Sequence, residues 1–195
     1  MKVKLIRHGK TPGNLAGKYI GSTDEPIIDG YHKTRKPDHS PDAVLYCSPM
    51  LRCVQTAAML LPDMNPVIVD DLREMDFGVF ERRSHAEMEN DPQYSKWLDG
   101  QCKDRCPGGE HPAEFFKRAC NAFRDIVSRG GEEIIIVTHG GVITAIMSRF
   151  CSESEGMEFS RWFIPNLHGY EIHVDPSDGD IRIIGHSRFS CEDEL

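Results

Sequence analysis

Short apolar runs that alternate with helical patterns constrain the fold of this chain most strongly. We expect buried strands over Val3–Arg7, Ala43–Cys47 and Glu133–Thr138. The clearest helical spacing of apolar residues covers Pro112–Arg129, and Gly130 ends it. Strands that alternate with helices in this order are typical of a mostly parallel sheet covered by helices. The sequence therefore predicts an α/β fold.

The length of the chain, 195 residues, suits a single domain over residues 1–195. Near its end, Tyr170–Val174 and Ile181–Ile184 are predicted to form a hairpin around Asp178-Gly179. No apolar run approaches the roughly 18 residues that indicate a transmembrane helix. The charged Arg7 also comes too early for a secretory signal. We therefore expect a cytoplasmic protein that has no membrane partner.

The formal net charge of -8 argues against binding to nucleic acid or to an anionic membrane. A few arginines gathered in one pocket could still bind a small phosphate ester. The seven cysteines are an odd number without a CxxC motif, and Cys102 and Cys106 are the closest pair. A structural zinc site requires four spaced ligands. We therefore expect reduced thiols, no metal and no cofactor.

Two of the predicted strands end in a histidine that is followed by glycine. The first strand leads into His8, and Glu133–Thr138 leads into His139. Ligands of open α/β sheets bind at the carboxyl ends of the strands, so we expect the two histidines to meet. Arg7 precedes His8, and Arg52 lies in the first turn of the helix after the second strand. This set predicts an anion site, because a guanidinium matches phosphate oxygens bidentately.

Five blocks of sequence resemble the histidine phosphatase superfamily, the phosphoglycerate-mutase-like proteins, and they occur in the family's order. The blocks are Leu5–Thr11 with Asn14 and Gly21–Pro26, then Ser48–Ala57, Leu72–Glu81, Pro107–Glu110 and Val137–Gly141. An Arg-His-Gly triplet alone would be weak support, whereas five ordered blocks are specific. The resemblance implies a three-layer α/β/α sandwich with a mostly parallel sheet.

The resemblance also implies a role for each matching residue. His8 matches the nucleophile that accepts the phosphoryl group, and Glu74 matches the proton donor. The implied catalytic residues are His8, Glu74, His139, Arg7 and Arg52, and the implied substrate-binding residues are Arg7, Asn14, Arg52, His139 and Gly140. The implied ligand is a small phosphorylated metabolite.

The chemistry fits these residue types. A neutral imidazole can attack phosphorus in line and form a phosphohistidine, which divides one difficult step into two. The charge then spreads over three equatorial oxygens, where Arg7, Arg52 and a protonated His139 could stabilise it without a metal ion. Glu74 would protonate the leaving oxygen and later accept a proton from the attacking water.

Some positions keep a second interpretation. Glu81 lies close enough to Glu74 in the sequence to be the acid instead. Asn14 could merely cap or turn a short helix. A buried histidine is often structural, and Arg52 could be a surface helix cap.

The chain departs from the family pattern in two places. The segment Asp29–Asp42 is short and contains Pro37 and Pro41, so the helix usually found there is expected to be shortened. A thinned layer could expose an apolar patch for a partner subunit, which makes a homodimer a hypothesis. Arg82 and Arg83 follow the third block where the family usually has glycine. They could extend the anion pocket, although we favour a position that faces solvent.

The sequence favours a histidine acid-type phosphatase that hydrolyses a small phosphate monoester through His8. Its size and blocks are similar to those of alpha-ribazole phosphatases, and equally to those of broad-specificity sugar-phosphate phosphatases. A phosphoglycerate-mutase-type phosphotransferase is the main alternative, but such proteins generally carry insertions that this compact chain lacks. A non-catalytic phosphate-binding protein and a metallohydrolase are weaker alternatives. The first would lack a nucleophile or an acid, and crowded arginines disfavour a cation in the second.

Overall fold

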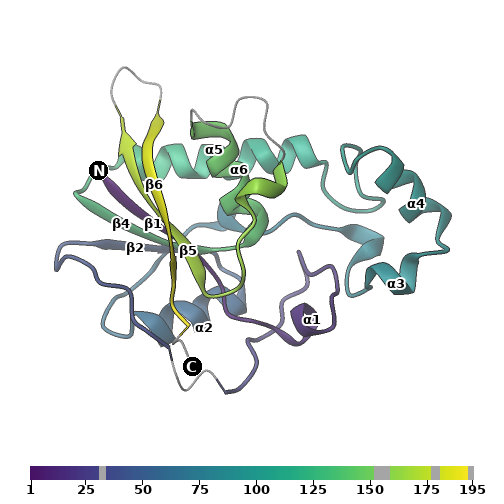
Figure 1. Ribbon diagram of the computed structural model, residues 1–195, viewed down its shortest axis with the longest axis horizontal. Coiled ribbons are helices and arrows are strands. Elements are labelled where there is room, and N and C mark those ends of the chain that lie inside the picture. The colour runs from purple at the N-terminus through teal and green to yellow at the C-terminus, as the bar shows by residue number, and fades with distance from the viewer. Residues whose placement is uncertain (31–33, 152–158, 177–180, 193–195) are drawn as a thin grey trace.

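The computed structural model describes residues 1–30, 34–151, 159–176 and 181–192, with a six-stranded sheet at its centre (Figure 1). In these ranges the strands are β1 Lys2–Arg7, β2 Val44–Cys47, β3 Val67–Ile68, β4 Glu133–Thr138, β5 His168–Asp175 and β6 Arg182–Ser190. The strand order is β3-β2-β4-β1-β5-β6. The pairs β3-β2, β2-β4 and β4-β1 are parallel, whereas β5 and β6 form an antiparallel edge. The predicted mostly parallel sheet is therefore confirmed.

Helices cover both faces of this sheet. The α-helices of the described ranges are α1 Pro12–Leu15, α2 Leu51–Leu60, α3 His85–Met88, α4 Pro92–Asp99, α5 Pro112–Ser128 and α6 Gly140–Phe150. Short 3-10 helices cover Asp70–Leu72, Gly78–Phe80 and Phe159–Trp162. Helices α5 and α6 lie on one side and α2 on the other, which gives the expected three layers (Figure 1). None of the helices described here has both the length and the apolar character needed to span a bilayer.

The central strands are apolar because both of their faces are covered. In β4, Ile134 and Ile136 pack in the core beneath α5 and α6, while Ile135 and Val137 pack in the core beside α2. Each of these side chains is fully buried. A strand buried on both faces loses the alternation of polar and apolar residues, so its sequence reads as one continuous apolar run. The same burial fixes the register that aligns the ends of β1 and β4.

The segment Asp29–Asp42 contains no helix in its described residues, in agreement with the expected shortening. The expected apolar patch, however, is wrong. The buried Lys4 occupies this face, where its Nζ pairs with Glu133 Oε1 at 3.1 Å and with Glu171 Oε2 at 3.5 Å. A cavity of about 540 Å³ beside it is lined mainly by charged and polar side chains. Ion pairs therefore occupy this part of the layer in place of a helix. The homodimer stays a hypothesis.

The predicted C-terminal hairpin is confirmed in its strands. β5 and β6 pair antiparallel, with a register shift between His173 and Val174. Its proposed turn at Asp178-Gly179 lies outside the described residues. The pairing of β5 with β1 extends the sheet beyond its parallel part, which places β1 in the interior of the sheet next to β4.

Candidate active site

The carboxyl ends of β1 and β4 bring the two predicted histidines together. Arg7 lies opposite Thr138 in the parallel register, so the next residues, His8 and His139, are neighbours. Their ring centroids are 5.2 Å apart with an interplanar angle of 65°. Both side chains are buried. The predicted meeting of two strand-end histidines is therefore confirmed.

The ring of His8 presents a free nitrogen. His8 Nδ1 lies 2.7 Å from the carbonyl oxygen of Gly9. A carbonyl only accepts hydrogen bonds, so Nδ1 carries the proton and the lone pair is on Nε2. Burial holds the pKa of His8 well below its usual 6.5, and the charges of Arg52 and Arg7 act in the same direction against the opposing hydrogen bond to Gly9. At neutral pH the ring is therefore uncharged and nucleophilic at Nε2.

His139 begins helix α6 and is held from two sides. Its Nε2 lies 2.9 Å from Ser48 Oγ, and Arg52 Nε donates to its Nδ1 at 3.3 Å. A guanidinium only donates, so Nδ1 must accept and the proton of the ring lies on Nε2. Burial first, then the nearby Arg52 and His8, hold the pKa of His139 well below its usual value. The expectation of a protonated His139 is therefore wrong for this arrangement.

The guanidinium groups of the fully buried Arg52 and the partly buried Arg7 flank the histidines, and neither forms an ion pair with a carboxylate among the described residues. Arg52 is fully buried and donates to the carbonyl oxygens of Thr23 and Gly21, each at 2.8 Å. Arg7 donates to the carbonyl oxygen of Ile164 at 2.7 Å, and its buried Nε has no hydrogen-bond partner among the described residues. The pKa of Arg7 is lowered, mainly because of burial, and the nearby Glu74 opposes part of this shift. Buried charges are normally paired, so this arrangement attracts an anion.

Gly140 and Asn14 occupy the expected positions beside these groups. A side chain at Gly140 would place its Cβ 3.3 Å from Arg7 Nε, so glycine lets the start of α6 approach the guanidinium closely. Asn14 forms a capping box with Thr11, and its Oδ1 also accepts from Asn166 Nδ2 at 3.1 Å. The capping interpretation of Asn14 is thus confirmed. With Oδ1 engaged in this way, the amide nitrogen of Asn14 remains able to donate to an anion.

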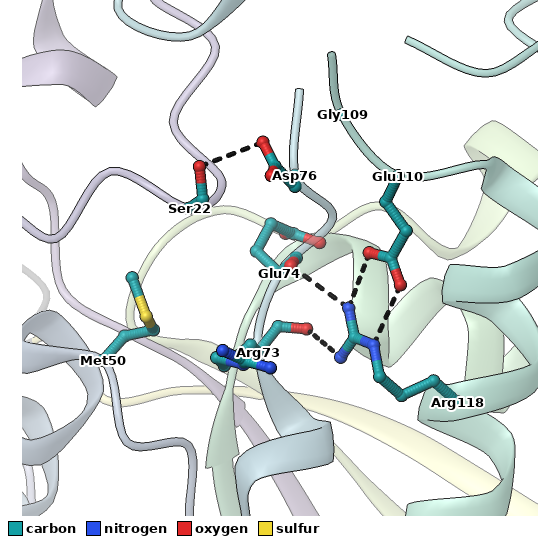
Figure 2. A pocket seen from close by; sticks show the side chains of 8 residues that line it. All are labelled: Ser22, Met50, Arg73, Glu74, Asp76, Gly109, Glu110 and Arg118. Carbon is teal, nitrogen blue, oxygen red and sulfur yellow. Dashed lines mark hydrogen bonds and ion pairs between the residues drawn. The ribbon is translucent and has the colours of Figure 1, made fainter. Parts of the chain in front are cut away.

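Glu74 lies between helix α6 and a cavity of about 290 Å³ (Figure 2). Its Oε2 accepts from the backbone N–H of Gly141 at 2.9 Å, and its Oε1 accepts from that of Met75 at 3.1 Å. The cavity is lined by Ser22, Met50, Arg73, Glu74, Asp76, Gly109, Glu110 and Arg118. The carboxyl group therefore lies at the wall of the cavity and contacts the start of helix α6.

Glu81, the alternative acid, is occupied elsewhere. Both of its oxygens accept from the 21–23 loop, including the hydroxyl of Thr23 at 2.6 Å and the N–H of Ser22 at 2.9 Å. The carbonyl oxygens of that loop hold Arg52. Glu81 therefore fixes the loop that fixes Arg52, and this geometry favours Glu74 as the acid.

Arg82 and Arg83 do not extend the anion pocket. Arg82 is exposed, and Arg83 Nη1 donates to Asp91 Oδ2 at 2.9 Å. Neither side chain lines the cavity beside Glu74. The preferred interpretation that they face away from the pocket is confirmed for Arg82, whereas Arg83 is partly buried in an ion pair.

The structure also adds residues to which the sequence analysis assigned no role. Asn166 Nδ2 donates to the carbonyl oxygen of His8 at 2.9 Å, and Ser48 contacts His139 as described above. Arg118, from α5, reaches the backbone around Glu74. Ser48 stands in one of the family blocks, so its position was a usable signal. Asn166 and Arg118 carry no such signal, because their positions depend on contacts between segments distant in sequence.

Replacing Gly141 with alanine is expected to lower kcat on alkyl phosphates by on the order of 100-fold, the usual share of a general acid. The added Cβ would lie 2.2 Å from Glu74 Oε1 and displace that carboxyl group. The helix itself should tolerate alanine, which favours helices by about 1 kcal/mol over glycine. Steady-state kinetics and thermal unfolding together test this. Gly185→Ala, whose Cβ would meet nothing closer than 3.7 Å, is the control. An unchanged kcat for Gly141→Ala would contradict the placement of Glu74.

The two buried histidines predict a loss of stability in acid. Both have folded-state pKa values below 6.5, so below that pH the unfolded chain binds protons that the folded chain does not. The free energy of unfolding should then fall by about 1.4 kcal/mol per pH unit for each histidine until its folded-state pKa is reached. Urea unfolding of wild type and His8→Asn between about pH 7 and pH 5 measures this slope. Equal slopes for the two proteins would contradict the lowered pKa of His8.

Comparison with known proteins identifies the family of the chain. A family model described as the histidine phosphatase superfamily (branch 1) matches residues 3–186. The adenosylcobalamin/alpha-ribazole phosphatase of Salmonella typhimurium is 30% identical over 164 residues, which cover 76% of this chain and 79% of that protein. The metal-independent phosphoserine phosphatase of Arabidopsis thaliana is 29% identical over 168 residues, 78% of this chain and 70% of that protein.

Solved structures show the same fold. The crystal structure of the alpha-ribazole phosphatase from Shigella flexneri superposes with a TM-score of 0.72 at 23% identity and covers 94% of each chain. The likeness in fold and the sequence match thus point the same way. The chain belongs to the histidine phosphatase superfamily (branch 1), and with it to the phosphatase and phosphotransferase enzymes.

Proposed function

We propose that the protein hydrolyses a small phosphate monoester through a phosphohistidine on His8. The observation that carries this proposal is the pair of guanidinium groups beside the Nε2 lone pair of a neutral His8, namely the fully buried Arg52 and Arg7 with its buried, unpartnered Nε. A phosphate dianion is the ligand that satisfies such a set, because it supplies both the missing negative charge and the acceptor oxygens.

In the first step His8 Nε2 attacks phosphorus while the ester oxygen leaves on the opposite side. The new N–P bond takes the lone pair of the ring, and the leaving oxygen takes the bonding pair and a proton from Glu74. Arg7 and Arg52 stabilise the charge on the equatorial oxygens.

In the second step water attacks the phosphohistidine. Glu74, now a carboxylate, accepts a proton from that water, and the N–P bond breaks to return the electron pair to Nε2. The products are inorganic phosphate and a neutral His8. His139 serves this cycle as a neutral ring that connects Ser48 to Arg52 and so keeps the guanidinium in place.

The cavity beside Glu74 is the place we propose for the leaving group, and its lining is mainly polar and charged. Its volume is about 290 Å³, and Met50 is its main apolar side chain. Alpha-ribazole phosphate, phosphoserine and sugar phosphates are the substrates to compare, because the first two are suggested by the names of relatives. We propose alpha-ribazole phosphate as the first substrate to test, in keeping with the sequence and fold likeness.

The direct test is hydrolysis of 4-nitrophenyl phosphate and of this substrate panel in the presence of EDTA. We expect release of inorganic phosphate that EDTA leaves unchanged, since the arginines supply the charge that a metal ion would otherwise provide. Loss of all activity in EDTA would contradict the metal-independent mechanism. Transfer between positions of phosphoglycerate, without release of phosphate, would favour the mutase alternative.

A further inference from the structure

We propose that Arg118 and Glu110 form a clamp that positions Glu74 for proton transfer. The inference rests on the proposed function, in which Glu74 is the proton donor. Both residues also line the cavity beside Glu74, but neither is hydrogen-bonded to the histidines or the arginines of the anion site. We therefore assign them as positioning residues that act through Glu74. Figure 2 shows the guanidinium of Arg118 between Glu110 and the backbone of Arg73 and Glu74.

The first half of the clamp is a bidentate ion pair. Arg118 Nε donates to Glu110 Oε1 at 3.0 Å, and Arg118 Nη2 donates to Glu110 Oε2 at 2.8 Å. The two side chains are only 17% and 19% exposed. A fork of this kind fixes both the position and the plane of the guanidinium.

The second half holds the chain segment that carries Glu74. Arg118 Nη1 donates to the carbonyl oxygens of Asp71 and Arg73, each at 2.9 Å, and Nη2 donates to that of Glu74 at 3.3 Å. Three carbonyl groups between residues 71 and 74 are therefore tied to one side chain on helix α5. This segment is otherwise a short 3-10 turn followed by extended chain, which has few hydrogen bonds of its own.

The backbone of Glu110 also contributes to the clamp. Its N–H donates to the carbonyl oxygen of Asp76 at 2.9 Å, so the 107–110 loop is tied to the same segment on the other side of Glu74. The Glu74 carboxyl is then fixed at its tip by Gly141 and at its base by the clamp. Because a misplacement of about 1 Å can cost on the order of 100-fold in rate, this base should matter for catalysis.

A lysine cannot replace Arg118, because a single ammonium group cannot span the carboxylate and three carbonyl groups at once. The chain also offers a matched control nearby. Arg105 donates to both carboxyl oxygens of Glu114, at 2.9 and 2.8 Å, and to the carbonyl oxygen of Gly109 at 3.1 Å. Arg105 therefore forms an exposed ion pair through Nη2 alone and does not contact the segment that carries Glu74.

The experiment compares two leaving groups in wild type, Arg118→Lys, Glu110→Gln and Arg105→Lys. 4-Nitrophenyl phosphate releases a stable phenolate that needs little protonation, whereas glycerol 2-phosphate releases an alkoxide that needs a proton. We expect Arg118→Lys and Glu110→Gln to lower kcat for glycerol 2-phosphate by roughly 10- to 100-fold and for 4-nitrophenyl phosphate by less than about threefold. Arg105→Lys should change neither value.

A double-mutant cycle with Glu74→Gln separates positioning from general damage. If Arg118 acts through Glu74, adding Arg118→Lys to Glu74→Gln should cause less than about a twofold further loss on glycerol 2-phosphate. Equal losses on both substrates, or full additivity in the cycle, would overturn the clamp. If Arg118→Lys does not fold, Glu110→Gln supplies the same comparison and cycle. Inactive wild type on both substrates would instead contradict the proposed function, and the clamp with it.

Discussion

Replacing His8 with alanine is expected to abolish turnover, with a loss on the order of 10⁶-fold in kcat, the size seen when a hydrolase loses its covalent nucleophile. The reason is local. His8 Nε2 is the ring nitrogen left free by the Nδ1 contact to Gly9, and burial keeps the ring neutral. The arginines would still bind phosphate in the variant, so KM or phosphate affinity should change far less than kcat.

Two measurements make this prediction specific. Steady-state hydrolysis of 4-nitrophenyl phosphate gives kcat, with the exposed His39→Ala as the control for a histidine outside the site. The second measurement uses a substrate labelled on its phosphoryl group, with the reaction quenched rapidly without acid. Wild type should then carry a labelled phosphoryl group that is stable in base and released in acid, and His8→Ala should carry none. Retained activity, or a label that persists in folded His8→Ala, would show that another group carries the phosphoryl.

The sequence could predict those parts of the site that follow from strand ends. Parallel strands in register bring their terminal residues together. The pairing of β1 with β4 therefore places His8 next to His139. Arg52 follows the same logic, since it lies in the first turn of α2 directly after β2. These predictions needed only the positions where strands end and helices begin, which the local sequence pattern indicates.

Other parts depend on contacts that no local pattern reveals. The protonation of His139 depends on Arg52 Nε facing its Nδ1, and only a side-chain conformation decides that. The choice between Glu74 and Glu81 is similar, because the two carboxyl groups differ in which residues donate hydrogen bonds to them, and spacing in the sequence does not reveal this. The polar filling around Lys4 was also missed, since a shortened helix predicts an exposed face without saying what covers it.

The chain also shows how one acidic side chain can serve an anion site indirectly. Glu81 accepts from the 21–23 loop, that loop presents the carbonyl oxygens of Gly21 and Thr23, and these hold Arg52. A carboxylate in direct contact with Arg52 would neutralise it and compete with phosphate. Neutral carbonyl groups orient the guanidinium equally well and leave its charge available to the substrate.

Replacing Arg52 with lysine is therefore expected to lower kcat/KM by roughly 100- to 1,000-fold, although the charge is kept. A single ammonium group cannot donate to Gly21, Thr23 and His139 while also binding phosphate. The variant should also lose most of the stabilisation by phosphate, which in wild type reaches about 2.7 kcal/mol at 100 times the dissociation constant. Thermal unfolding with and without phosphate measures this, with the exposed Arg129→Lys as the control. If Arg52→Lys were stabilised by phosphate as strongly as wild type, the anion site would not depend on a buried guanidinium, and Arg7 alone would have to account for it.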